Sequence, residues 1–164
     1  MDKGGRAEGK PNQPARSQEE EAFLALLRTA DRLQTRLANM LKPQGLSPTQ
    51  YNALRILRGA GAEGLACREV GERMIKRDPD ITRLLDRMAQ RGLVSRGRER
   101  KDRRVIRARI TASGLERLKA IDRDLGTFHR ELLGHLGPQR LESLIRLLDA
   151  VRGDLWSAPR IRGR

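Results

Sequence analysis

The sequence predicts a mainly α-helical fold with a small β-hairpin, in which three short helices and the hairpin are flanked by long helices at both ends. Three observations predict this class. Apolar residues recur every three or four positions in six segments, which is the period of an amphipathic helix. One segment mixes apolar and basic residues over a short span, as a pair of strands does. Glycine, proline or a helix-capping residue separates the segments. The length of 164 residues suits a single domain.

Two segments precede the three short helices. Residues 1–16 are rich in Gly, Pro, Lys and Arg, which predicts a disordered basic arm that is either simply solvated or in contact with nucleic acid. Residues 17–45 begin with the capping-box spacing of Ser17 and Glu20 and continue as an amphipathic helix to about Leu41, after which Pro43 and Gly45 break the helix. The apolar stripe of this helix is formed by Phe23, Leu26, Leu27, Ala30, Leu33, Leu37 and Leu41.

Three short helices are expected next. The first begins with the start signal at Ser47, and the second covers about residues 67–75. The third has Asp78 as a cap and Pro79 as its first residue, and it stops at Gly92. The residues expected to be buried on these helices are Tyr51, Leu54, Leu57, Val70, Met74, Ile81, Leu84, Leu85 and Met88.

Residues 93–110 depart from helical spacing. Two short strands joined by a charged loop fit this segment better than a helix does. Three short helices followed by a two-stranded hairpin constitute a winged helix-turn-helix, so residues 46–111 are expected to form this domain. The apolar residues of the hairpin are Leu93, Val94, Val105, Ile106, Ala108 and Ile110.

Residues 112–156 are expected to form two further helices, the first capped by Thr111 and the second beginning after Pro138. Residues 157–164 form a basic tail. The helices at the two ends of the chain carry more apolar surface than one antiparallel pair can bury. We therefore expect them to pair with a second copy of the chain in a two-fold homodimer.

The charge balance favours a polyanionic partner. Lysine and arginine number 35 against 21 acidic residues, a formal net charge of +14 at pH 7, which suits nucleic acid or an anionic membrane surface. Aromatic residues make up 2% of the chain, too few for the stacking platforms that bind single strands, so duplex DNA is favoured. No apolar run approaches the ~20 residues of a membrane span, and the amino terminus lacks the apolar core of a signal peptide. A cytoplasmic protein is expected.

The basic residues are concentrated in the hairpin. Residues 91–109 include nine basic and two acidic side chains, a net charge of +7 that is half of the chain's total. A solvated surface usually mixes its signs more evenly, so phosphate contact is expected here, with a solvated charge run as the alternative. The candidate DNA-binding residues of the hairpin are Arg98, Arg100, Lys101, Asp102, Arg103 and Arg104.

The helix before the hairpin is expected to read bases. When its apolar face turns inward, Thr82, Arg83, Asp86 and Arg87 face outward. The Arg83 guanidinium can bind guanine O6 and N7 bidentately, and the Thr82 methyl group can meet a thymine methyl group. Arg87 is expected either to contact a phosphate or to pair with Asp86.

Residues 18–155 resemble the MarR family of transcription regulators in the order of their helices and in two motifs. Asp102-Arg103-Arg104 followed by Ile110-Thr111 is similar to the family's wing motif, Asp-x-Arg and then Leu-Thr, at the same spacing. Residues 81–88, closing with residues 91–94, resemble its recognition helix.

The resemblance implies a homodimer built from the terminal helices, with the recognition helices in successive major grooves and Arg104 in the minor groove at the wing tip. It also implies that Asp102 braces the wing through a neighbouring arginine; a plain turn residue is the alternative. Asp80 departs from the family, in which a small or hydroxylated residue is common here. We expect Asp80 to cap the helix in preference to accepting a hydrogen bond from cytosine N4.

The sequence reveals no effector, metal or cofactor. Some members of the resembled family sense small ligands in a crevice between the dimer helices and the DNA-binding lobe, and others sense peroxide through a cysteine on the first long helix. Cys67, the only cysteine, does not lie on that helix and is expected to be a half-buried filler. Glu131 and His135 have the i, i+4 spacing of metal ligands, but no further His or Cys ligand lies near them in sequence.

The expected function is sequence-specific binding of duplex DNA by a transcription regulator. It would act as a homodimeric repressor on a pseudo-palindromic operator, and a small-molecule effector could release it. The alternative is a non-specific architectural protein of the nucleoid type. An enzyme is not expected, because two separated histidines, one cysteine and no phosphate-binding Gly-rich loop leave no convincing active site.

Overall fold

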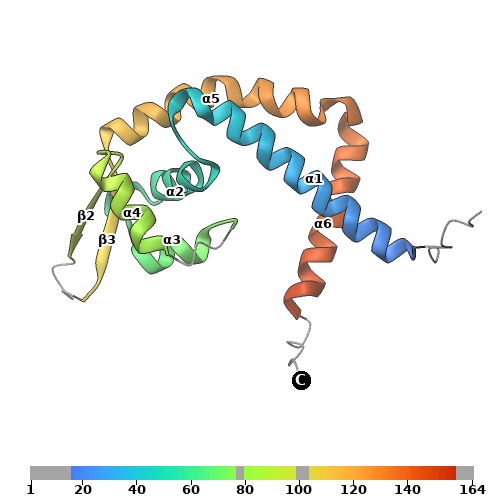
Figure 1. Ribbon diagram of the computed structural model, residues 1–164, viewed down its shortest axis with the longest axis horizontal. Helices are drawn as coiled ribbons and strands as arrows, with labels where there is room; N and C mark the ends of the chain where they lie inside the picture. Colours follow the sequence, from blue (N-terminus) through green and yellow to red (C-terminus); the bar gives the residue numbers. More distant parts are fainter. Residues whose placement is uncertain (1–15, 77–79, 99–103, 158–164) are drawn as a thin grey trace, which may run out of the picture. The chain divides into compact units, whose positions relative to one another are not determined.

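The computed structural model describes residues 16–76, 80–98 and 104–157 and confirms the predicted fold class, with helices throughout and one small antiparallel sheet (Figure 1). The chain divides into two compact units, residues 1–36 and residues 37–164. The elements are α1 (Gln18–Leu41), η1 (Lys42–Gln44), α2 (Pro48–Gly59), η2 (Gly61–Glu63), β1 (Leu65–Ala66), α3 (Cys67–Arg73), α4 (Ile81–Gln90), β2 (Val94–Arg98), β3 (Ile106–Ile110), α5 (Ala112–Leu133), η3 (Gly134–Leu136) and α6 (Gly137–Ser157).

Helix α1 begins where the sequence predicts. The Ser17 hydroxyl accepts a hydrogen bond from the Glu20 backbone N–H at 3.2 Å, which satisfies one of the free donors at the start of the helix. Hydrogen bonds from the backbone and from Ser17 lower the pKa of the nearby Glu19 carboxyl. Phe23 and Leu27 of the predicted apolar stripe are exposed. The first unit therefore presents an uncovered apolar surface.

The core of the second unit lies where α2, α3 and α4 meet the sheet and the first half of α5. The predicted inward face of α4 is confirmed: Leu85 and Met88 have no exposed surface and Leu84 is 3% exposed. Leu118 and Ile121 of α5 reach the same core. This packing fixes which face of α4 remains outside. The other fully enclosed large side chains are Leu41, Leu54, Leu57 and Val70.

The sheet has three strands in the order β1-β3-β2, and all pairs are antiparallel. The hairpin of β2 and β3 pairs Val94 with Ile110 at one end and Arg98 with Ile106 at the other. The predicted hairpin is thus present. The short strand β1, which pairs with β3 on its other side, was not predicted because two residues are too few to show an alternating pattern.

Helix α6 begins at Gly137 and not after Pro138 as predicted, and two further helix boundaries differ from the prediction. Helix α3 ends at Arg73, short of Ile75, whose backbone N–H donates to the Asn52 side chain at 2.9 Å. Helix α4 begins at Ile81, later than predicted, and Asp80 is its cap. Asp78 and Pro79, the predicted cap and first residue, lie outside the described residues. In both cases a side chain competes with the backbone for the terminal hydrogen bonds.

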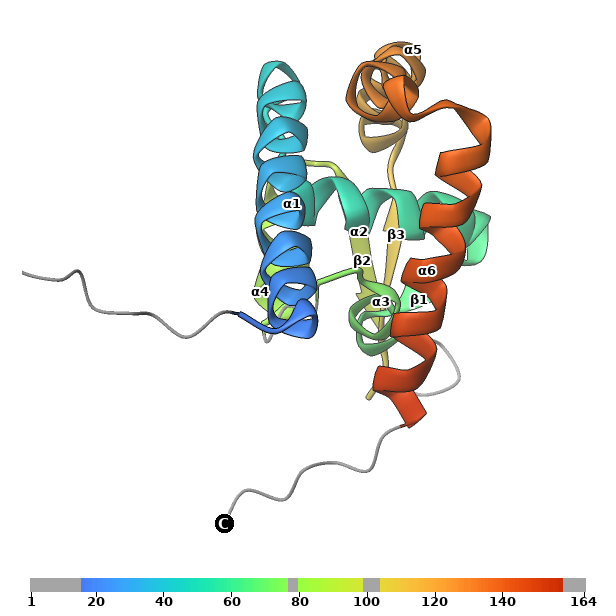
Figure 2. The same cartoon turned by 90° about the vertical axis from the view of Figure 1, so that its right-hand side faces the viewer.

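Helix α5 connects the core to the last helix. Thr111 caps it as predicted, since its hydroxyl accepts from the Gly114 N–H at 3.1 Å. Arg58 of α2 pairs with Asp122 of α5, and its hydrogen bond to that carboxylate raises the pKa of the Arg58 guanidinium. At η3 the chain turns from α5 into α6, as Figures 1 and 2 show. The ion pair between Arg58 and Asp122 joins α5 to α2.

Candidate DNA-binding surface

The start of α4 is held by Asp80. One oxygen of its carboxylate accepts from the Arg83 backbone N–H at 3.2 Å, and the other lies 3.1 Å from Arg83 Nε. The capping role expected for Asp80 is therefore present. The Arg83 side chain is 79% exposed, so this contact is a surface ion pair, which contributes about 0–1 kcal/mol at most. The Arg83 guanidinium is therefore only weakly held in this position.

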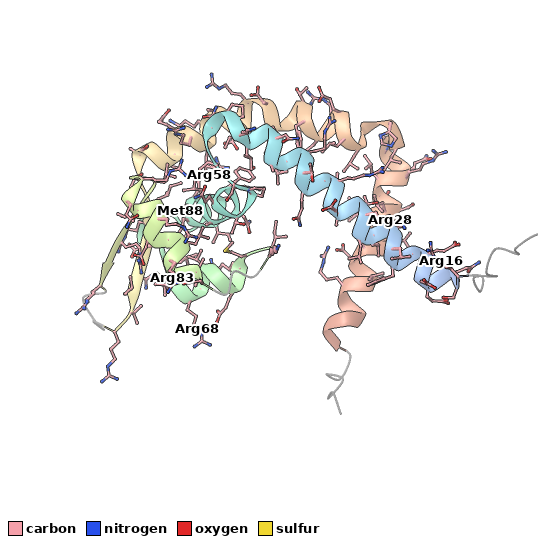
Figure 3. The ribbon with its side chains drawn as sticks, in the orientation of Figure 1. Arg16, Arg28, Arg58, Arg68, Arg83 and Met88 are labelled. Carbon is pink, nitrogen blue, oxygen red and sulfur yellow. The ribbon has the colours of Figure 1, made fainter. Side chains whose placement is uncertain are left out.

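The outer face of α4 carries the residues that the sequence places there. Thr82, Arg83, Asp86 and Arg87 are all exposed, opposite the buried leucines and Met88. Figure 3 shows the side chains of Arg83 and Met88 on this helix. Asp86 does not pair with Arg87. Its partner is Arg96 of β2, so the alternative in which Arg87 neutralises Asp86 is wrong.

The basic run of residues 91–109 does not form one DNA-facing patch. Arg91, at the end of α4, donates to the Gly45 carbonyl at 2.8 Å and to the Gln50 side chain at 3.3 Å. Gln50 Oε1 also accepts from the Ser47 N–H in the capping box of α2. Arg91 therefore ties the end of α4 to the start of α2 and to the loop before it.

Two arginines of β3 are used in the same way. Arg107 donates to the Gly64 carbonyl at 3.2 Å, and Arg109 donates through Nε to the Ala62 carbonyl at 3.1 Å. Both hold the segment that leads from η2 into β1. Gly64 has φ 63°, and a Cβ there would lie 2.2 Å from the backbone oxygen of Ala108. Only glycine allows the two backbones to approach this closely.

At least four of the nine basic residues in the run therefore bind groups of their own chain, and the interpretation of the whole run as a DNA contact is too broad. The alternation of side chains along a strand could have indicated that Arg96 faces its own chain, because it follows the buried Val94 by two positions and so shares its face of β2. The long-range carbonyl partners of Arg91, Arg107 and Arg109 have no signal in the local sequence. The other five basic residues of the run are those predicted to contact DNA: Arg98, Arg100, Lys101, Arg103 and Arg104.

The wing is the hairpin formed by β2, β3 and the loop between them, and its predicted DNA-binding residues are only partly described. Arg98 is exposed at the end of β2, and Arg104 is exposed in a turn just before β3. They stand at opposite sides of the loop that joins the strands, so the hairpin carries basic residues on both of its arms. The predicted residues Arg100, Lys101, Asp102 and Arg103, and with them the brace expected from Asp102, lie outside the described residues.

Two other features considered in the sequence are a cysteine and a possible pair of metal ligands. Cys67 is buried at the start of α3. Glu131 lies on α5, whereas His135 lies beyond the end of that helix in η3. In the part of the chain that the structure describes, no three His, Cys, Asp or Glu side chains gather where they could hold a metal ion. Among the same residues, no helix combines the length and apolarity needed to cross a membrane.

A buried helix face, an outer face with Thr82 and Arg83, and an adjoining basic hairpin define the class of winged helix-turn-helix DNA-binding proteins. A model of the MarR family matches residues 44–105. The HTH-type transcriptional repressor IacR of Pseudomonas putida is 30% identical over 136 residues, which cover 81% of this chain and 78% of that protein. The chain belongs to the MarR family of transcription regulators.

Solved structures agree with this assignment. The crystal structure of a MarR transcription factor from Planctomyces limnophilus is 40% identical, with a TM-score of 0.64 over 83% of this chain and 98% of that one. The organohalide-sensing transcriptional regulator RdhR, solved with 2,4-dichlorophenol bound, has a TM-score of 0.79 at 13% identity, over 89% of this chain and 86% of that one. The second likeness concerns the fold alone.

Proposed function

We propose that this protein is a homodimeric repressor that binds a pseudo-palindromic operator and reads its sequence through α4. The observation that carries the proposal is the outer face of α4, where exposed Thr82, Arg83 and Arg87 stand opposite the buried leucines and Met88. A rigidly packed helix with polar side chains outward is what major-groove readout requires. The protein would act in the cytoplasm by occupying DNA and not by catalysis.

Each candidate residue has a distinct role in this proposal. Arg83 reads a guanine, Thr82 contacts a thymine methyl group, and Arg87 contacts a phosphate. Pro79, which lies outside the described residues, is assigned a contact with the DNA backbone on the basis of its sequence position alone. On the wing, the basic residues Arg98, Arg100, Lys101 and Arg103 contact phosphates. Asp102 braces the wing through a neighbouring arginine, and Arg104 enters the minor groove.

The proposed dimer is supported by apolar side chains that remain exposed on the terminal helices. On α1 they are Phe23, Leu26 and Leu27, and on α6 they are Ile145, Leu147 and Val151. Monomeric proteins rarely expose so many large apolar residues on two helices. A second copy that covers them would place two α4 helices for two half-sites, and this matches operator symmetry to protein symmetry.

Release by a small molecule is part of the proposal. RdhR, which shares this fold, has been solved with 2,4-dichlorophenol bound. A ligand that binds the DNA-free form of the dimer better than the DNA-bound form would lower DNA affinity by its differential affinity alone. We propose an effector of this kind without assigning its chemistry.

The alternative is an architectural protein that coats DNA without choosing sites, which the net charge of +14 favours. Selection of bound DNA from a random pool distinguishes the two. A repressor yields a recurrent site with two related half-sites, separated by about one helical turn. A pool that stays random after several rounds, with uniform protection of genomic fragments, supports the architectural protein.

Arg83→Ala tests the reading role. At the selected site we expect a loss of ~1–3 kcal/mol in binding free energy, confined to one base pair per half-site. Competition between the wild-type site and its single-base variants measures this. The matched comparison is Arg87→Ala, which should weaken all sites about equally because a phosphate contact carries no sequence information. An unchanged site preference for the Arg83 variant refutes its role as a reader.

A further inference from the structure

Asp86 places a negative charge on the face of α4 that is proposed to meet DNA. It follows Thr82 by four positions and Arg83 by three, so all three lie on neighbouring positions of one helix surface. The Asp86 side chain is 50% exposed. A carboxylate in this position repels the phosphates that its neighbours attract, unless another group neutralises it.

Arg96 supplies that group from the wing. It lies on β2, where it pairs in register with the fully buried Ala108 of β3, and its guanidinium forms an ion pair with Asp86. Its side chain is only 13% exposed, and its Nε is buried without a hydrogen-bond partner in the described part of the chain. Arg96 is therefore poorly placed to reach a phosphate itself.

We propose that Arg96 is a positioning residue that promotes DNA binding through Asp86. It neutralises the Asp86 carboxylate and holds it against β2, so that Thr82, Arg83 and Arg87 approach the DNA without a free negative charge between them. This deepens the proposed function and rests on it. The role differs from that of Arg98, which follows Arg96 by two positions on the same strand but is exposed.

The ion pair joins a largely buried guanidinium to a half-exposed carboxylate, which supports this division of roles. Removing Arg96 leaves the Asp86 carboxylate uncompensated on the surface proposed to meet DNA, whereas removing both groups leaves no such charge. For contacting residues the coupling commonly corresponds to a factor of about 2 to 150 in an equilibrium constant. We therefore expect the effect of Arg96 on DNA affinity to depend on the presence of Asp86.

The test is a double-mutant cycle on the full-length protein. DNA affinity is measured for the wild type, Arg96→Met, Asp86→Asn and the double variant, on the selected site and on a duplex of scrambled sequence. Methionine keeps an apolar side chain at the buried position while it removes the charge. We expect Arg96→Met to bind about tenfold more weakly, Asp86→Asn to bind as well as the wild type or better, and the double variant to match Asp86→Asn.

The salt dependence of binding adds a second readout. Because Arg96 contacts no phosphate in this proposal, the slope of log affinity against log salt stays unchanged when Arg96→Met is made in the Asp86→Asn background. Arg98→Ala is the matched control. It should lower the slope by about 0.9, the value for one phosphate contact, and Asp86→Asn should not restore its affinity.

Three outcomes overturn the proposal. Losses that add in the double variant, with a lower salt slope, show a direct phosphate contact by Arg96. A double variant that stays as weak as Arg96→Met shows that the pair acts only as a mechanical tie between α4 and β2. If the wild type binds no duplex DNA, the proposed function fails and this proposal fails with it. Urea unfolding of each variant establishes that the proteins compared are folded, and Arg96→Gln replaces Arg96→Met if the latter is not.

Discussion

Replacing Gly114 by alanine places a methyl group against the backbone at the base of the wing. Gly114 is the third residue of α5 after its cap, Thr111. A Cβ there would lie 2.3 Å from the carbonyl oxygen of Leu93 and 2.8 Å from Cγ1 of Ile110. The Leu93 oxygen also accepts the Thr111 N–H at 3.2 Å. The methyl group can therefore be accommodated only if α5 moves away from the end of the sheet.

Two effects of opposite sign decide the magnitude. Alanine favours a helix over glycine by ~1 kcal/mol in a helix interior, and by less in the first turn. Overpacking costs ~1–3 kcal/mol, and the upper end applies because the obstacle is backbone and cannot rotate away. We expect Gly114→Ala to lower the free energy of unfolding by about 2 kcal/mol, because the steric effect exceeds the propensity gain.

Gly126→Ala on the same helix is the matched control. Apart from its own helix backbone and chain neighbours, the described part of the chain brings just Arg130 Nη1, at 3.7 Å, within 4 Å of such a Cβ. The propensity gain of about 0.5–1 kcal/mol therefore acts alone. The two variants should therefore differ by about 3 kcal/mol in unfolding free energy. In a chain of this length that corresponds to about 6–12 °C in melting temperature.

Urea unfolding followed by circular dichroism measures both variants. The protein concentrations must be equal, because the stability of a dimer depends on concentration. If Gly114→Ala is as stable as the wild type, α5 does not approach the Leu93 carbonyl as closely as the structure indicates, and the reasoning is refuted. A stabilised Gly126→Ala beside it would show that the assay detects the smaller effect.

The remaining predictions concern DNA and assembly. Arg104→Ala should lower DNA affinity most on sites with A·T-rich minor grooves, where the negative potential is strongest. Fluorescence anisotropy on A·T-rich and G·C-rich versions of one site measures this. Equal affinity of wild type and variant contradicts the wing-tip role. Ile145→Glu should shift the protein from the proposed dimer to a monomer, because it places a charge on the exposed apolar surface of α6. Sedimentation velocity measures the mass, and Glu142→Gln on the same helix is the control. An unchanged dimer would exclude this surface from the interface.

Much of the fold could be predicted from the sequence because it depends on neighbours in the chain. Ser47 and Thr111 start α2 and α5 through hydrogen bonds to backbone groups three residues away, and such signals are complete within one turn. The buried face of α4 follows from the spacing of its apolar residues, and the exposure of Thr82 and Arg83 follows with it. The MarR resemblance rested on the same local pattern.

The tertiary structure alone decided which of the described arginines bind distant carbonyl groups of their own chain. Arg91 binds a carbonyl 46 residues away in the chain, and Arg109 binds one 47 residues away. The amino-acid composition does not distinguish these arginines from Arg98, because each counts as one positive charge. The strand β1 is a similar case, since its two residues are a strand only because β3 passes beside them. Periodicity and capping describe contacts within one element, whereas the partner of a long side chain depends on which distant backbone the packed core brings within its reach.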